Sequence, residues 1–156
     1  MGSYTMTDSI PRVRVEGFFR ALASCDMQAL EPYLDDEVSW TIGGPVDILP
    51  FCGRHVGKAK VIEMLGHPLL LDQWGLVLQS VLVDGDRAAV LGKLVARLHD
   101  VGHAISYRVA QFVQFRNGQV IEYTSLIDSF DAVEQVLGHR LAGPGGMRRG
   151  DDLVAV

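Results

Sequence analysis

Two side chains in the sequence could move a proton near neutral pH. Asp128 ends a run of alternating apolar and polar residues, and His55 lies in a loop rich in glycine and proline. Histidine titrates close to neutral pH, so His55 could act as a general acid or base. Each also has a structural interpretation. Asp128 precedes a predicted helix, a position that favours capping of the helix N–H groups, and His55 could be a partly buried loop histidine.

A second group of residues could bind a small molecule. Tyr107, Gln111, Tyr123 and Ser125 have the spacing of inward-facing strand positions and would add a few hydrogen-bonding groups to an apolar interior. Buried polar groups without partners cost free energy, so several on one face indicate water or ligand among them. The alternative is a polar core whose groups bond one another. The predicted ligand-binding residues are Phe18, Trp40, Phe51, Tyr107, Gln111, Tyr123 and Ser125.

The segment from Trp40 to Lys58 holds four glycines and two prolines. A phosphate-binding loop needs four residues between its glycines and Ser or Thr after the lysine, whereas here three residues separate Gly53 from Gly57 and an alanine follows the lysine. Residues 45–52 are too apolar for a solvated loop and must cover something. We expect this segment to plug the open end of the core or to close a pocket mouth as a lid.

No metal or cofactor is predicted. The five histidines show none of the spacings of a metal site, and His99 and His103, which flank a predicted turn, are more simply two solvated imidazoles. Cys25 and Cys52 are too few for a disulfide framework. Because no signal peptide is visible, we expect both to be reduced thiols in a cytoplasmic protein.

The composition excludes several classes of protein. The length of 156 residues favours one domain, and 48% apolar with 21% charged residues is typical of a globular chain. The net charge is -5 and no basic stripe is visible, so no nucleic-acid partner is expected. No apolar run approaches the roughly 20 residues of a membrane helix, so no membrane partner is expected. We expect a flexible N-terminus over 1–8, one α+β domain over 9–140 and a flexible glycine-rich tail over 141–156.

The elements that must position these residues are helices first and a long meander afterwards. Apolar spacing separates the two kinds of element, and Asn117-Gly118 is a strong hairpin signal. The predicted helices begin near residues 9 and 27 and span 57–65 and 129–138, and the predicted strands span 37–42, 76–83, 87–98, 103–116 and 119–127. This order predicts an α+β fold in which a curved antiparallel sheet of four to five strands carries helices on its concave face and encloses a cone-shaped pocket.

Both faces of this sheet are partly apolar. On the strand over 103–116, the odd positions run from Ile105 to Phe115 and the even positions from Ser106 to Gln114, and neither set is plainly solvated. A sheet that is apolar on both sides is covered on both sides. We therefore expect a homodimer through the face that the helices leave open.

The chain resembles the nuclear-transport-factor-2-like superfamily, in its SnoaL-like and ketosteroid-isomerase-like branch. The order of the elements and three sequence segments carry this resemblance. The segments are LDDEVSW, GGPVDILPFCGRHVGKAKVIEML and RNGQVIEYTSLIDSFDAVEQVLG, and the resemblance runs from Val13 to Gly138. It implies a conical pocket and often a homodimer. Members include isomerases, cyclases, dehydratases, epoxide hydrolases and non-catalytic binders, so the fold alone does not imply an activity.

The catalytic residues of two branches of this superfamily are largely absent. Ketosteroid isomerases use a first-helix tyrosine and two aspartates, and the corresponding positions here hold a phenylalanine, a threonine and a glutamine, which cannot supply the same proton donors and base. Epoxide hydrolases similar to the limonene-epoxide enzyme use an Arg-x-Asp pair and an aspartate that ends the last strand, and only the last of these matches. The aligned positions are Phe18, Thr41 and Gln111 for the first branch and Lys93, Val95 and Asp128 for the second.

The function predicted from the sequence is therefore the binding of a small apolar molecule in a conical pocket. Isomerisation, cyclisation or hydration without a cofactor are the reactions that Asp128 or His55 could support there, with Tyr107 or Tyr123 as hydrogen-bond donor. The alternatives are a non-catalytic binding module and a dimeric scaffold whose interior is filled by side chains.

Overall fold

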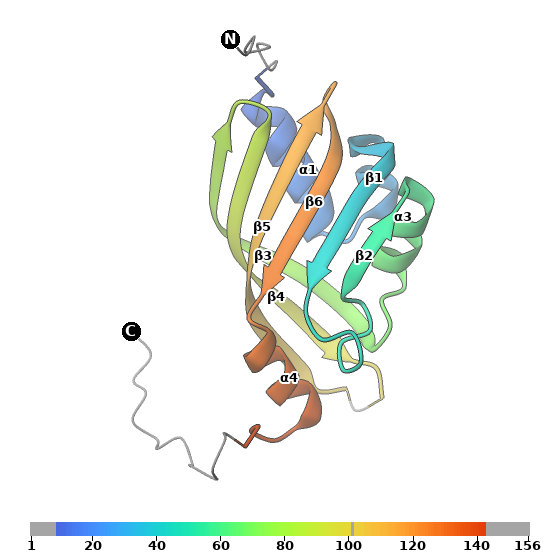
Figure 1. Ribbon diagram of the computed structural model, residues 1–156, viewed down its shortest axis with the longest axis vertical. Coiled ribbons are helices and arrows are strands. Elements are labelled where there is room, and N and C mark those ends of the chain that lie inside the picture. The colour runs from blue at the N-terminus through green and yellow to red at the C-terminus, as the bar shows by residue number, and fades with distance from the viewer. Residues whose placement is uncertain (1–8, 101, 143–156) are drawn as a thin grey trace, which may run out of the picture.

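Six strands form one curved sheet in the order β2-β1-β6-β5-β4-β3 in the computed structural model, which describes residues 9–100 and 102–142 (Figure 1). The strands are β1 (Leu34–Gly43), β2 (Gly53–Val56), β3 (Leu71–Asp84), β4 (Arg87–Leu98), β5 (Ala104–Arg116) and β6 (Gln119–Ile127). The helices are α1 (Arg12–Ala23), α2 (Met27–Leu30), α3 (Lys58–Gly66) and α4 (Ser129–Leu137), with a 3-10 turn at Glu31–Tyr33. Among the residues described, no helix is long and apolar enough to span a membrane.

The predicted α+β class with a curved sheet is confirmed, and its strand count and pairing differ in detail. The segment Gly53–Val56, expected to be loop, pairs antiparallel with β1, and β1 in turn lies parallel to β6. The sheet is therefore mixed and has six strands. Four residues are too few for an alternating pattern to stand out, which is why β2 gives no clear signal in the sequence. Of the predicted terminal segments 1–8 and 141–156, residues 1–8 and 143–156 lie outside the described residues.

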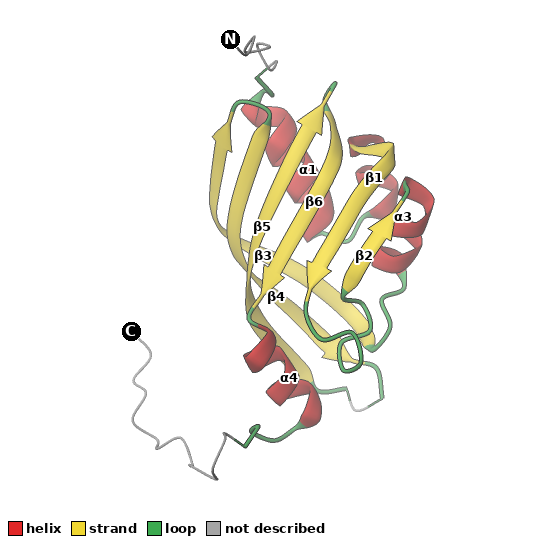
Figure 2. Ribbon diagram, in the orientation of Figure 1, coloured by secondary structure: helices red, strands yellow, loops and turns green. Residues whose placement is uncertain are grey.

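The helices cover one face of the sheet. Figure 2 shows α1 behind the strands, and the apolar stripe of α1 packs there as its spacing predicts. Phe18 lies at the centre of an aromatic cluster and meets Trp40 and Phe115 edge-to-face at ring-centroid distances of 6.4 Å and 5.8 Å. These contacts fill the space between α1 and the sheet at this point.

Strand β6 changes register once, and the change decides which side chains face inward. Gln114 pairs with Glu122 whereas Phe115 pairs with Val120, so Ile121 has no partner in β5. A bulge of this kind reverses the alternation beyond it. Tyr123 and Ser125 are buried on the helix-covered face as expected, but at the other end Val120 rather than Ile121 enters the core.

Helix α4 docks against the lower part of β5, beyond the end of β6 (Figure 1). The amide of Gln135 donates to the Ser106 carbonyl oxygen at 2.7 Å and accepts from the Ser106 N–H at 2.9 Å. One side chain thus satisfies the backbone groups that a neighbouring strand would otherwise bond. The helix ends at Gly138, whose φ of 73° suits a residue without a side chain.

Candidate functional site

Five polar or amphipathic side chains gather on the helix-covered face of β1, β5 and β6. Trp40 is the Cα partner of Tyr123 across the parallel pair, and Gln111 is the partner of Ser125 across the antiparallel pair. Tyr107 lies two inward positions along β5 from Gln111. All five are buried, with exposed fractions of 4% or less. The predicted set is therefore brought together in the interior, and we call Trp40, Tyr107, Gln111, Tyr123 and Ser125 the interior polar cluster.

One wall of this cluster is aromatic. The rings of Trp40 and Tyr123 stack with centroids 3.6 Å apart and an interplanar angle of 12°. Phe18 from α1 meets the Trp40 ring at 67°, and Phe51 from the loop before β2 is also buried. Contact with a third ring holds this stacked pair in a well-defined position in the interior.

Within residues 9–100 and 102–142, three polar atoms of the interior polar cluster have no hydrogen-bond partner. They are the Trp40 indole nitrogen Nε1, the Tyr107 hydroxyl oxygen and the Gln111 carbonyl oxygen Oε1. The Tyr123 hydroxyl differs, because it is hydrogen-bonded to Ser125. A buried polar group left without a partner costs about 1–3 kcal/mol. Three in one interior are therefore a concentrated cost that a bound molecule could remove.

The ionisable groups of the interior are held in their neutral forms. Burial is the main cause that raises the pKa of Tyr107, with a smaller contribution from nearby Cys52. Burial also raises the pKa of Tyr123 above its usual range, and the bond to Ser125 offsets part of this effect. Burial raises the pKa of the Cys52 thiol to about 11. Near neutral pH both phenols are hydrogen-bond donors, and Cys52 is a thiol rather than a nucleophilic thiolate.

His55 lies at the edge of the interior polar cluster. It is the Cα partner of Trp40 across the antiparallel pair of β1 and β2, so both side chains are on the same face of the sheet. The half-buried ring places Nε2 at 3.3 Å from the Phe51 carbonyl oxygen. Because a carbonyl only accepts, this contact requires the proton on Nε2 and leaves Nδ1 of the neutral ring as a free base.

Asp128 occupies a different environment. It is the residue before α4, and its carboxylate accepts from the Asp131 N–H at 3.5 Å. The other carboxylate oxygen lies 3.4 Å from the guanidinium of Arg108, an exposed residue on the opposite face of β5 from Tyr107. The structure therefore places Asp128 as a helix cap and ion-pair partner. Among the described residues, the buried polar side chains are Gln111 and Ser125, and no Asp or Glu is buried.

The apolar loop between β1 and β2 folds into the end of the core. Pro45 O accepts from the N–H groups of Ile48 and Leu49 at 3.1 Å and 2.7 Å, which forms a tight turn. Leu49, Phe51 and Cys52 are buried, and a Cβ atom at Gly44 would lie 2.6 Å from the Cys52 sulfur. The loop thus plugs the interior in this structure, and the space beside Cys52 requires a glycine at position 44.

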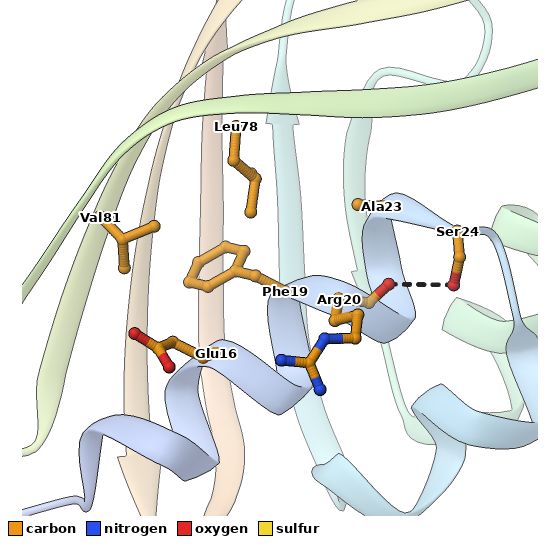
Figure 3. Close-up of a pocket in the computed structure, with 7 residues that line it drawn as sticks. All are labelled: Glu16, Phe19, Arg20, Ala23, Ser24, Leu78 and Val81. Carbon is orange, nitrogen blue, oxygen red and sulfur yellow. Dashed lines mark hydrogen bonds between the residues drawn. The ribbon is translucent and has the colours of Figure 1, made fainter.

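A separate groove lies between α1 and the edge strand β3 (Figure 3). It is an open groove with a volume of about 480 Å³, lined by Glu16, Phe19, Arg20, Ala23, Ser24, Leu78 and Val81. None of the predicted ligand-binding residues lines it. Four of the lining residues, from Glu16 to Ala23, have the spacing of one helical stripe in which charged and apolar residues alternate. This pattern is visible in the sequence, but neither predicted site includes it.

Comparison with known proteins shows which family the chain belongs to. Residues 15–123 match the model of the SnoaL-like domain. The chain belongs to the SnoaL-like domain family. The crystal structure of a putative isomerase from Rhodopseudomonas palustris is 32% identical, with a TM-score of 0.67 over 80% of this chain and 93% of that one. A search of curated protein sequences finds no match to this chain.

Two more distant structures share the fold. TerC, co-crystallised with polyporic acid, is 17% identical with a TM-score of 0.70 over 80% of this chain and 96% of that one. An epoxide hydrolase from M. tuberculosis, similar to the limonene-epoxide enzyme, is 15% identical with a TM-score of 0.65 over 81% of this chain and 88% of that one. At these identities the likeness concerns the fold, and the predicted resemblance to the nuclear-transport-factor-2-like superfamily is confirmed.

The positions aligned with the epoxide hydrolase pair lie away from the interior of this SnoaL-like domain. Lys93 and Val95 are exposed on β4, on the face opposite to the buried Ala96. Of the positions aligned with ketosteroid isomerases, Phe18 is buried on α1 and Gln111 is buried on the helix-covered face of β5. Among the residues described, no three His, Cys, Asp or Glu side chains come together as metal ligands would.

The cap geometry predicts how substitutions of Asp128 affect stability. Asp128→Ala removes the side chain that accepts from the α4 N-terminus, and we expect it to lower the free energy of unfolding by about 1 kcal/mol. Asp128→Asn keeps a good capping oxygen and should cost clearly less. Urea denaturation followed by circular dichroism measures both. Equal losses for the two variants would show that the charge pairing with Arg108, rather than the cap, is the important contact.

Proposed function

We propose that this SnoaL-like domain binds a small, mostly apolar molecule among the residues of the interior polar cluster. The three buried polar atoms without partners carry the proposal. The Trp40 indole can only donate, the Tyr107 hydroxyl can donate or accept, and Gln111 offers its carbonyl oxygen as acceptor. A ligand with one carbonyl and one hydroxyl group would satisfy all three atoms. The surrounding apolar side chains would cover the rest of its surface.

The aromatic wall favours a planar ligand. The stacked rings of Trp40 and Tyr123 would lie against a flat ring system more closely than against a branched chain. TerC was crystallised with polyporic acid, and that compound is therefore a reasonable first probe for a chain of the same fold.

Entry of a ligand requires the loop between β1 and β2 to move. Pro45, Val46, Asp47 and Pro50 are exposed, whereas Leu49 and Phe51 are buried against the interior. We propose that residues 45–52 act as a lid that withdraws Leu49 and Phe51 when a molecule enters. Its internal backbone bonds, such as the bond from Cys52 N to Leu49 O at 2.9 Å, would let it move as a unit.

Binding without chemistry is the first function we propose, and proton transfer by His55 is the second. His55 is paired with Trp40 on the helix-covered face, which is the observation that favours the second function. Donation from Nε2 to the Phe51 carbonyl oxygen would leave Nδ1 as the basic atom. Abstraction of a proton next to a carbonyl, with Tyr107 donating to the developing oxyanion, would be isomerase-type chemistry. The R. palustris neighbour is named as an isomerase, which agrees with this reaction class.

Two tyrosine variants test the binding site. Tyr107→Phe removes an atom without a partner, so the ligand-free protein should keep its stability or gain up to about 1 kcal/mol. Tyr123→Phe removes a hydroxyl that is bonded to Ser125 and should lower stability by about 1 kcal/mol. With polyporic acid as probe, Tyr107→Phe should weaken binding roughly fivefold, because one hydrogen bond is lost. Chemical denaturation and calorimetric titration measure these effects.

The comparison between the two variants is the control. Loss of stability in Tyr107→Phe equal to that in Tyr123→Phe would mean that the Tyr107 hydroxyl already has a partner. Binding of the probe that is unchanged in Tyr107→Phe, with the protein correctly folded, would place the ligand elsewhere.

Solvent deuterium exchange tests the second function. An enolisable aromatic ketone such as α-tetralone exchanges its α-hydrogen for deuterium if a base on the protein removes it, and proton NMR follows the loss of signal. If His55 acts as the base, exchange should exceed the buffer rate with the wild-type protein, lose this excess in His55→Gln and retain it in Asp128→Asn. No excess with the wild-type protein would leave binding as the function, and an active His55→Gln would exclude His55 as the base.

We also propose that the face without helices forms a homodimer interface. Six large apolar side chains are exposed on this face, with exposed fractions from 40% at Val95 to 66% at Leu82. Cross-strand pairs join them: Leu91 pairs with Ala110, which pairs with Leu126. We call this set the outer apolar patch, and its members are Val77, Leu82, Leu91, Val95, Phe112 and Leu126. Large apolar side chains exposed together on one face of a sheet are typical of an interaction surface.

A charge placed in the outer apolar patch tests the dimer. Light scattering after size exclusion should show a dimer for the wild-type chain. Leu91→Glu should raise the dissociation constant by more than about a hundredfold, because burial of an unpaired charge costs several kcal/mol. Val13→Glu is the matched control, since Val13 is an exposed apolar residue of α1. A wild-type monomer at high concentration, or equal dissociation of both variants, would contradict the proposed interface.

A further inference from the structure

The groove between α1 and β3 has the size and lining of a second small-molecule site. Its volume of about 480 Å³ is within the range of ligand pockets, roughly 300–1,000 Å³. In Figure 3 the Phe19 ring lies between Leu78 and Val81 of β3 on one side and Glu16 and Arg20 of α1 on the other. Phe19 is fully buried and forms the floor, whereas Leu78 and Val81 are half-exposed walls. The groove is thus apolar in its depth and charged along the helix.

The charges along the groove do not cancel. Glu16 pairs with Arg12 at 2.8 Å, and Arg12 also reaches the Val81 carbonyl oxygen at 3.5 Å. Arg20, one turn beyond Glu16, is exposed and has no ion-pair or side-chain hydrogen-bond partner among the described residues. One carboxylate thus faces two guanidinium groups on one helical stripe, which leaves a net positive charge beside an apolar floor. An anion with an apolar body complements this arrangement.

A groove beside a sheet edge could instead bind an extended peptide as an added strand. The structure of β3 disfavours this alternative. β3 is the last strand of the sheet, but the Trp74 carbonyl oxygen already accepts from the Cys25 thiol at 2.7 Å. Arg12 contacts the Val81 carbonyl oxygen farther along the same edge. Between them the pairing with β4 shifts register between Leu78 and Ser80. A bulged edge with some of its carbonyl groups already contacted is a poor template for a further strand.

We propose that this groove binds a small apolar monocarboxylate, with its hydrocarbon body on Phe19, Leu78 and Val81 and its carboxylate at Arg20. The carboxylate would supply the partner that Arg20 lacks, as a charge-assisted hydrogen bond to the guanidinium. The hydrocarbon would cover the walls of the groove that water now contacts. This site is distinct from the interior polar cluster, and the proposal does not depend on ligand binding there.

Octanoate is the probe, and two octyl compounds of the same length are its controls. Titration of the isotope-labelled full chain, followed by amide NMR, should give saturable shifts at Ala23, Leu78 and Val81 with octanoate. Octan-1-ol should bind more weakly, and octylammonium should bind most weakly. Added salt should reduce octanoate binding, because the pair at Arg20 is exposed. Octylammonium binding as tightly as octanoate would overturn the proposal.

Charge variants of the same stripe give effects of opposite sign. Arg20→Gln should weaken octanoate binding roughly three- to fivefold, the effect of losing an exposed ion pair. Arg20→Lys should retain most of the affinity. Glu16→Gln should strengthen binding roughly two- to threefold, because it removes the one carboxylate and frees Arg12. Arg97→Gln, at an exposed arginine of β4, is the matched control and should change nothing.

Three further results would also overturn the proposal. Octanoate shifts confined to Tyr107, Gln111 and Tyr123 would place the carboxylate in the interior. Shifts that extend linearly without saturation would show non-specific contact only. An extended peptide that shifts the amides along β3 more strongly than octanoate does would make the groove a peptide site. The comparison of the octyl compounds uses the wild-type chain, so the test stands even if one variant fails to fold.

Discussion

The parallel pairing of β1 with β6 is the constraint on which the rest of the site depends. It places Trp40 beside Tyr123, and their rings stack at 3.6 Å. It also leaves β2 at the end of the strand order, paired with β1, and so brings His55 next to Trp40. Pairing two strands that are distant in sequence closes a long loop, which costs conformational entropy. Contacts of this kind must offset that cost. The buried aromatic cluster around Phe18 supplies them on the helix side.

Burial and hydrogen bonding conflict in the interior. Inward positions of β5 are apolar except for Tyr107 and Gln111, and both carry an atom without a partner. An interior optimised for stability would hold apolar residues at such positions, since a buried polar group is favourable only when it is bonded. Residues that lower the stability of the fold in this way are expected at functional sites. Among the described residues, no Asp or Glu side chain is buried in this interior.

The same sheet presents three surfaces of different character. Its helix-covered face holds neutral hydrogen-bonding groups, and its open face carries the outer apolar patch. Its β3 edge meets α1 across a groove with an excess of positive charge. Alternation of side chains along each strand makes the first two surfaces independent of one another, because neighbouring residues point to opposite faces. Asp128 and Arg108 pair at the border of the open face, which keeps the carboxylate away from the interior.

Local patterns in the sequence determine the element types, most of the strand bounds and the inward set of β5. Strand β4 spans the predicted 87–98 and β6 the predicted 119–127, since Asn117-Gly118 fixes the hairpin between β5 and β6. The capping position of Asp128 is also a local property. Only the tertiary structure decides the partner of β1, the existence of β2, the bulge at Ile121 and the α1–β3 groove. Each depends on contacts between residues far apart in the chain, whose energies leave no periodic trace in the sequence.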